Sequence, residues 1–470
     1  MSTINETLIN IEKPSNGKLE GSFKERSIEP SGWPGWQLTL FRFFFLFFAL
    51  QILPIDWKLY KHIFTTNWLD FHFYDLFVIT KYLPEFISGD NLSKWGIASY
   101  VNWGIIALLA FFGTLAWNKL QPDKNEHNNL YYWLRAGLRY RLAIGIIAYG
   151  FIKLFPLQMP FPSLSNMHTN YGDFLPWKIY WHTIGITQGY ESFLGAVEIL
   201  AGLLLLNRKT VTFATGLIIG FTGNVLVANF SYDGGEHVYS SFLVLIATFL
   251  FIHDVPRLYN LLILEKKTLA EKFEPVFTKP LQNVRLAGKG LVAVFILVFG
   301  TSTYINYISD PYLIPGTPGL SGAYGFYNVK EFKLNNQTIP YSTTDPNRWQ
   351  NVIFEKWATI SIKIARPVKI DIGEASAKAS FDIDRNYESA GIGGRHYFAY
   401  TADTVNQTLS LQNKNKHHRN EKLELSYSRP DSSTIIVKGI NENKDSIYAV
   451  LERIDRKYML YEGRRKPVKL

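Results

Sequence analysis

Four charged residues interrupt long apolar stretches of this sequence, and they are the first candidates for chemistry. They are Arg42, Lys153, Glu191 and Glu198. A charge inside a lipid bilayer costs at least a few kcal/mol unless it is paired or hydrated, so such residues mark ion pairs, proton relays or substrate sites. We name Glu191, Glu198 and Lys153 as candidate catalytic residues, because two carboxyl groups and an amine could exchange protons with a lipid-soluble substrate.

Spacing and depth suggest how these charges pair. Glu191 and Glu198 are seven residues apart, nearly two helical turns, so both project from one face. Gly195 and Gly202 share that face, where glycines let a neighbouring helix approach closely. Arg42 and Glu198 would lie roughly 9 and 12 Å from the cytoplasmic boundary, and Lys153 and Glu191 about 5 Å from the outer one. We therefore predict two ion pairs, Arg42 with Glu198 and Lys153 with Glu191. The alternative is that the charges only fix helix register, with Lys153 reaching the surface.

A second group of polar residues is expected near the outer membrane surface. Asn224 falls in the outer half of an apolar stretch, Asp233 in the short turn after it, and His182 in a long outer loop. With Glu191 they predict an outer cavity in which carboxyl and imidazole groups meet a quinone or similar molecule. Arg42 is added as a further candidate for this cavity. The competing interpretation of the loop is an interfacial belt of aromatic residues.

Several cofactor-binding and metal-binding motifs are absent from the sequence, and this limits the redox chemistry that the chain could perform alone. The chain has no cysteine, which excludes iron–sulfur clusters, Cys-ligated zinc and thiol nucleophiles. It has no HExxH, Walker A or dinucleotide-binding glycine pattern, and we predict no metal site. A redox role would therefore use a diffusible substrate, a bound quinone or the cofactor of a partner.

Seven apolar stretches would position these residues. They are 36–55, 96–117, 142–155, 189–206, 211–230, 238–252 and 290–308. About 20 apolar residues suffice for a helix to cross the bilayer, and the shorter stretches can be extended at their boundaries. We predict a cytoplasmic segment over 1–35 and a membrane domain of seven transmembrane helices over 36–308.

Charge in the loops sets the expected orientation. With the N-terminus inside, the three inner loops hold fourteen Lys and Arg residues and the three outer loops hold five. Basic residues in short loops stay in the cytoplasm, so the chain should have its N-terminus inside and its C-terminal segment outside. We find no pattern of a cleavable signal peptide.

The outer segment, 309–470, reads as a β-domain. Apolar and polar residues alternate over 358–364, 422–427, 434–440 and 446–454, with turn-forming residues between the runs. Many short strands favour a sandwich or a small barrel. The segment carries +6 of the formal net charge of +10, but its basic residues are dispersed. A loop at 414–419 and a tail with Arg464, Arg465 and Lys466 are the exceptions, and we predict no nucleic-acid partner.

Three stretches of the membrane half together resemble a known family. They are 141–155 (RLAIGIIAYGFIKLF), 189–210 (GYESFLGAVEILAGLLLLNRKT) and 223–233 (GNVLVANFSYD). This set is similar to the DoxX-like membrane proteins and covers about 135–260, the four-helix core of that family. The resemblance implies a bacterial inner-membrane protein related to the small subunit of a thiosulfate:quinone oxidoreductase, and more distantly to HTTM-type domains. It carries no established catalytic residue over to this chain.

Two functions remain open at this point. One is a quinone-linked oxidoreductase, or a component of one, in which Lys153, Glu191 and Glu198 handle protons. The other is a non-enzymatic membrane-anchored subunit or assembly factor whose β-domain binds an envelope protein or lipid. The buried carboxyl groups favour the first, and a C-terminal segment of 162 residues favours the second. A transporter is disfavoured, because no internal repeat is visible.

Overall fold

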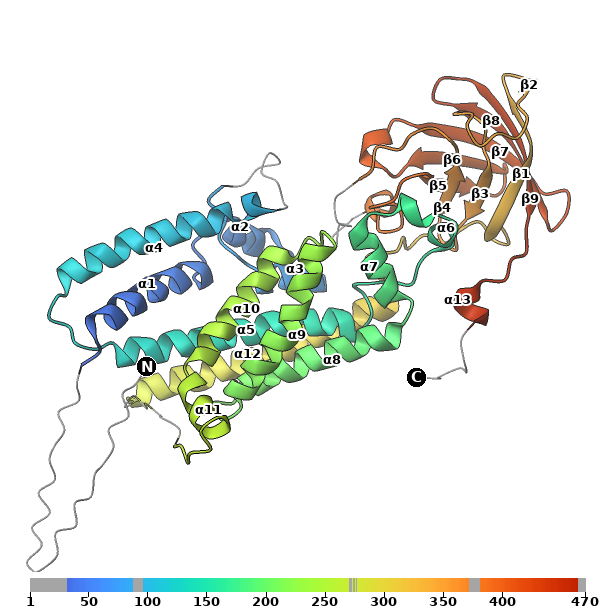
Figure 1. The fold of residues 1–470 in the computed structure, drawn as a ribbon. Coiled ribbons are helices and arrows are strands. Elements are labelled where there is room, and N and C mark those ends of the chain that lie inside the picture. Colours follow the sequence, from blue (N-terminus) through green and yellow to red (C-terminus); the bar gives the residue numbers. More distant parts are fainter. Residues whose placement is uncertain are drawn as a thin grey trace, which may run out of the picture.

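The computed structural model describes residues 32–87, 96–269, 273, 275, 277–371 and 381–463. A bundle of long helices lies beside a separate β-domain, with α12 running into the strands (Figure 1). Nearly all of the predicted cytoplasmic segment and the basic residues Arg464, Arg465 and Lys466 fall outside the described residues.

A long helix lies at each of the seven apolar stretches. These helices are α1 (Gly35–Ile52), α4 (Val101–Leu120), α5 (Asn128–Leu154), α8 (Gln188–Leu205), α9 (Val211–Ser231), α10 (His237–Ile252) and α12 (Lys279–Ser309). Short helices fill the connections: α2 (Trp57–Thr65), α3 (Phe73–Thr80), α6 (Leu164–Met167), α7 (Pro176–Gly185) and α11 (Val255–Leu262).

Four helical spans among the described residues are long and apolar enough to cross a membrane. They are Gly35–Thr65, Ile97–Leu120, Val211–Ser231 and Lys279–Ser309, and the bent pair α10 and α11 would make a fifth. Large apolar side chains on α4 and α12 are exposed, as expected of helices that face lipid. The chain is therefore consistent with a multi-pass membrane protein, and seven crossings remain a prediction.

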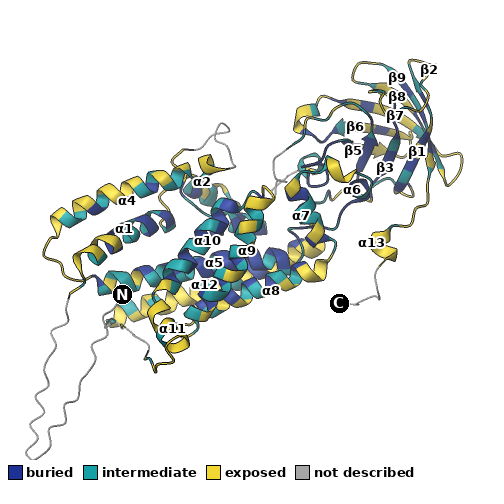
Figure 2. Ribbon diagram, viewed as in Figure 1, coloured by how far each residue is buried: buried dark blue, intermediate teal, exposed yellow. Residues whose placement is uncertain are grey.

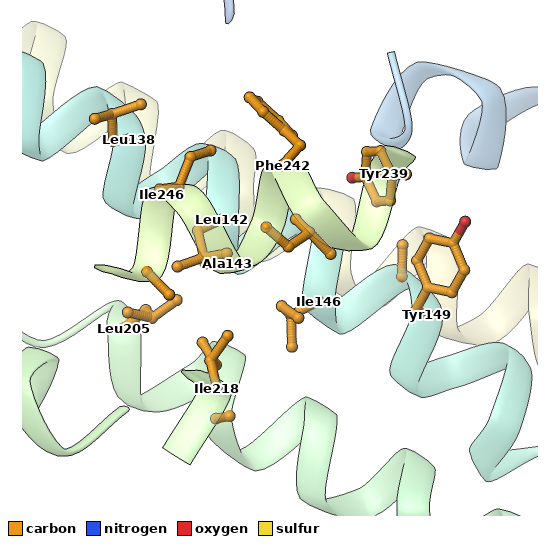
Figure 3. Close-up of a cluster of buried hydrophobic side chains, with 14 of the residues drawn as sticks. Leu138, Leu142, Ala143, Ile146, Tyr149, Leu205, Ile218, Tyr239, Phe242 and Ile246 are labelled. Carbon is orange, nitrogen blue, oxygen red and sulfur yellow. The ribbon is translucent and has the colours of Figure 1, made fainter. Parts of the chain in front are cut away.

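Helix α5 occupies the middle of the bundle, where α1, α3, α8, α10 and α12 all pack against it. It is mostly buried along its second half, whereas α4 and α12 expose much of their surface (Figure 2). Figure 3 shows Leu142 and Ile146 of α5 among Leu205 of α8, Ile218 of α9 and Phe242 of α10. Lys153, on this second half of α5, is thus enclosed by protein.

The C-terminal strands form a closed antiparallel barrel rather than a sandwich. They are β1 (Gly325–Leu334), β2 (Gln337–Thr338), β3 (Asn351–Phe354), β4 (Thr359–Lys363), β5 (His396–Asp403), β6 (Thr408–Asn413), β7 (Lys422–Ser428), β8 (Thr434–Asn441) and β9 (Ser446–Arg453). Each strand from β3 onward pairs with the next along the chain, and β1 pairs with both β3 and β9 to close eight strands. The two-residue β2 only extends a turn of β1. Apolar side chains fill the interior.

The connection between α5 and α8 docks on the outside of this barrel. Leu175 N–H donates to the Gly391 carbonyl at 2.9 Å, and Gly393 N–H donates to the Asp173 carbonyl at 2.7 Å. The Ser165 hydroxyl lies 2.7 Å from that of Ser361 on β4. Thr359 and Ser361 alternate with the apolar residues of β4, as predicted, and both are completely buried. The barrel and the bundle are therefore joined by a polar interface.

Candidate functional site

The central feature of the bundle is an ion pair between α5 and α8. The Lys153 ammonium lies 2.5 Å from a Glu198 carboxylate oxygen, and both side chains are almost fully buried. A buried ion pair of this kind lies in a low-dielectric environment. Removing either partner strongly destabilises the fold, because the other charge stays buried without compensation. Lys153 and Glu198, two of the predicted catalytic residues, are thus brought together.

Glycines allow the two helices to approach this closely. A Cβ added to Gly195 of α8 would lie 2.3 Å from the Leu154 nitrogen and 2.4 Å from the Gly150 oxygen of α5. A Cβ on Gly202 would lie 2.4 Å from the Ile147 side chain. Small residues at helix crossings are a common packing device in membranes. The predicted close approach at Gly195 and Gly202 is confirmed.

We expect Gly195→Ala to separate α5 from α8, because its methyl group would collide with backbone atoms that cannot rotate away. Overpacking of this kind costs about 1–3 kcal/mol of unfolding free energy. Gly220→Ala is the matched control, since a Cβ on Gly220 meets nothing within 4 Å. Thermal unfolding of the purified variants measures both effects. Equal melting temperatures for the two variants would contradict the close contact.

The predicted pairing of the four charges was wrong. Arg42 does not meet Glu198: its guanidinium donates to His127 at 3.1 Å, to the Asn118 side chain at 2.7 Å and to the Gln121 carbonyl at 2.9 Å. The reason is that helical side chains point toward the N-terminus of their helix. Arg42 therefore reaches back to the predicted cytoplasmic loop and takes no part in an outer cavity.

The same rule explains why Lys153 pairs with Glu198 and not with Glu191. α5 and α8 run in opposite directions, so Lys153 points away from the barrel and Glu198 points toward it, and the two meet between. Glu191 points toward the barrel end of α8, where its carboxylate accepts a hydrogen bond from Met159 N–H at 3.0 Å. Glu191 is fully buried against the loop that follows α5.

A second ion pair, between Lys81 and Glu236, lies near Lys153 and is bonded to Tyr149 of α5. The Tyr149 hydroxyl donates to Glu236 at 2.6 Å, and the Lys81 ammonium lies 2.6 Å from the other Glu236 oxygen. The Lys153 ammonium lies 5.9 Å from the centre of the Tyr149 ring. Protonatable groups thus extend from Glu198 through Lys153 and Tyr149 to the end of α3.

Sequence reasoning missed Tyr149, Glu236 and Lys81 as members of this group. One signal was present: Tyr149 precedes Lys153 by four residues and must share its helix face. Nothing in the local sequence connects Glu236 with Lys81, which lies 155 residues earlier in the chain.

Of the four residues predicted to line an outer cavity, Glu191 is fully buried, whereas Asn224 and Asp233 are exposed. A shared cavity of these residues stays a prediction. His182 is half-buried on α7, with its ring 5.2 Å from that of Phe174. Burial, together with the Lys178 charge, lowers the pKa of His182 to about 3, so this imidazole is neutral.

Beyond the bundle, the docked loop surrounds two buried carboxyl groups of the barrel. Glu355 accepts from Ser165 N–H at 2.7 Å and from Leu164 N–H at 3.3 Å. Glu388 accepts from the Lys414 ammonium at 2.8 Å and from the Trp357 ring N–H at 2.6 Å. Burial, with the Glu388 charge adding to it, raises the pKa of Glu355 to about 7. Glu355 is thus a carboxyl group that can gain or lose a proton near neutrality.

Within the described part of the chain, no group of three or more His, Asp or Glu side chains is placed to hold a metal ion. No family model, curated protein or solved structure matches the chain. The resemblance to the DoxX-like proteins therefore stays a prediction from sequence. What the geometry offers chemically is proton exchange by buried carboxyl and ammonium groups.

Proposed function

We propose that the protein exchanges protons with a quinone or similar lipid-soluble molecule, as a quinone-linked oxidoreductase of the DoxX-like type or as a component of one. The observation that carries this proposal is the buried Lys153–Glu198 pair, continued by Tyr149, Glu236 and Lys81. Reduction of a quinone takes up two protons with two electrons, and buried protonatable groups supply a route for the protons. The electrons would come from a partner or a diffusible donor.

The proposal includes a location in the bacterial inner membrane, with the N-terminus in the cytoplasm and the barrel outside. The distribution of basic residues between the loops supports this orientation. Seven crossings fit the long helices, if α5 and α8 cross while shielded by their neighbours. In this arrangement Lys153 and Glu191 lie near the outer side of the membrane, and Glu198 lies near its middle.

A second candidate function is a membrane-anchored subunit whose barrel binds an envelope protein or lipid. The observation that favours it is the packed interior of the barrel, which is filled by apolar side chains such as Phe354, Ile360 and Leu411. A barrel of this kind offers its outer surface and loops for contact rather than a central ligand cavity.

Purification in mild detergent separates the two functions. We expect roughly one quinone per chain after solvent extraction, and quinone-dependent turnover that Glu198→Gln abolishes. Glu442→Gln, at an exposed turn of the barrel, should leave both unchanged. A stoichiometric protein partner with no bound quinone would instead support the membrane-anchored subunit.

A further inference from the structure

A cavity of about 240 Å³ lies where the bundle meets the barrel. Pro156 after α5, Gln188 at the start of α8 and Tyr307 near the end of α12 line it from the bundle. Glu355 and Trp357, between β3 and β4, line it from the barrel. The cavity therefore sits at the level where these helices end, next to the expected membrane surface.

The lining of this cavity is mostly apolar, with polar groups from the bundle at Gln188 and from the barrel at Glu355 and Lys356. Phe161 and Leu313 contribute apolar surface, and Tyr324 contributes an aromatic ring. Glu355, only 3% exposed, is the buried charged group in the lining. An apolar pocket with a few convergent polar groups is the usual form of a small-molecule site.

Glu355 is fixed in position and retains capacity to bind. Its two oxygens accept one backbone N–H each, from Ser165 and Leu164, and these bonds hold the carboxyl group in place. The Ser163 and Ser165 hydroxyls also hydrogen-bond to Glu355, and rotation of either hydroxyl would leave an acceptor position for a ligand. If protonated, the carboxyl group itself donates a hydrogen bond. This chemistry suits a hydroxyl group, which both donates and accepts.

The size of the cavity limits what it can hold. Small-molecule pockets usually begin at about 300 Å³, so this cavity fits a head group and the first atoms of a chain. A longer tail would have to leave it. Apolar side chains of the last turns of α12 offer a path, because Tyr304 is 47% exposed and Ile308 is 61% exposed, beside the lining residue Tyr307.

We propose that this cavity binds the head group of an uncharged amphiphile, whose hydroxyl group bonds to Glu355 and whose apolar tail lies along the end of α12. A quinol and a monoacylglycerol share this chemistry. Only the quinol case rests on the proposed function; binding of a hydroxyl-headed lipid stands without it.

The position of the cavity would also connect it with the charges in the bundle. Leu157 and Pro160 line the cavity, and Met159 between them donates its N–H to Glu191. Glu191 therefore lies behind the part of the wall formed by the loop after α5, and Glu355 forms another part of the lining. A head group in the cavity would be flanked by two buried carboxyl groups.

The test uses the full-length protein in lipid nanodiscs and a monoacylglycerol with a photoreactive group in its acyl chain. We expect saturable labelling, with labelled peptides from the end of α12 or the loop after α5. Glu355→Gln should weaken labelling about tenfold or more, as loss of a hydrogen bond to a charged group does. Ile314→Trp, which fills the cavity from a half-buried position, should also weaken it, and Glu442→Gln should not.

Competition separates the two ligand sources. A short-chain quinol that displaces the probe places the substrate of the proposed function in this cavity, whereas displacement by unlabelled monoacylglycerol alone identifies a lipid site. Either result supports the proposed cavity, and labelling without quinone turnover would overturn only the oxidoreductase. Unsaturable labelling, or labelling equal in wild type, Glu355→Gln and folded Ile314→Trp, would overturn the binding site.

Discussion

Replacing Lys153 by methionine is expected to lower the free energy of unfolding by about 3–5 kcal/mol, because it leaves the Glu198 carboxylate buried without its cation. Methionine nearly matches the length and volume of lysine, so packing between α5 and α8 should change little. The measurement is the thermal midpoint of the purified variant, with its yield as a second readout.

Two further variants distinguish a lost charge from a lost contact. Lys153→Met combined with Glu198→Leu removes both charges and should recover most of the stability, since apolar replacement of a whole buried pair is often neutral. Lys58→Met is the matched control: Lys58 pairs with Glu85 at 2.8 Å, but both side chains are more than half exposed. Its effect should stay below about 1 kcal/mol. A double variant as unstable as Lys153→Met would contradict the account of the pair.

The second large effect concerns pH and Glu355. Burial and the neighbouring Glu388 raise the pKa of Glu355 to about 7 from an ordinary 4.5. The folded state then holds a proton that the unfolded state has released, so the stability from this group is complete below pH 4.5 and is lost as pH rises through 7. Relative to Glu355→Gln, the wild type should lose roughly 3 kcal/mol between pH 5 and pH 8.5.

Other groups at this interface titrate in the opposite sense, so the quantity to measure is the difference in stability between the wild type and Glu355→Gln. Burial, followed by the charges of Arg395 and Arg456, lowers the pKa of His168 to about 4. His182 behaves similarly, and both histidines lose stability as pH falls. Both histidines are present in the wild type and in Glu355→Gln, so their contributions to the difference in stability cancel. Unfolding midpoints across pH 5 to 8.5 provide the test, and a difference that does not change with pH would contradict a buried, protonated Glu355.

Local sequence patterns predicted much of the fold. Alternation over 358–364 and 434–440 indicated the strands β4 and β8, and apolar length indicated helices such as α9 and α12. The choice between sandwich and barrel was left open, because it depends on whether β1 pairs with β9, more than 100 residues away. Pairing over such a distance leaves no mark in a local pattern.

The site was only partly predictable, for reasons of geometry. The seven-residue spacing correctly placed Glu191 and Glu198 on one buried face, and the glycines correctly indicated a close neighbour. Membrane depth was counted from Cα positions, and it predicted the wrong ion pairs. The side chains of Lys153 and Glu198 lean toward each other from antiparallel helices, which a count of Cα positions does not include. Glu355 was not considered, since its burial arises from a loop nearly 200 residues earlier in the chain.

The most direct test of the account is a density map of the protein in nanodiscs whose lipids include quinone. Its central claim is that a lipid-soluble molecule reaches the barrel end of α5 and α8, beside Glu191 and the Lys153–Glu198 pair. The account predicts an elongated non-protein density in the cavity lined by Glu355 and Pro160. Density in which side chains alone occupy this space, with quinone only in the surrounding lipid, would contradict it.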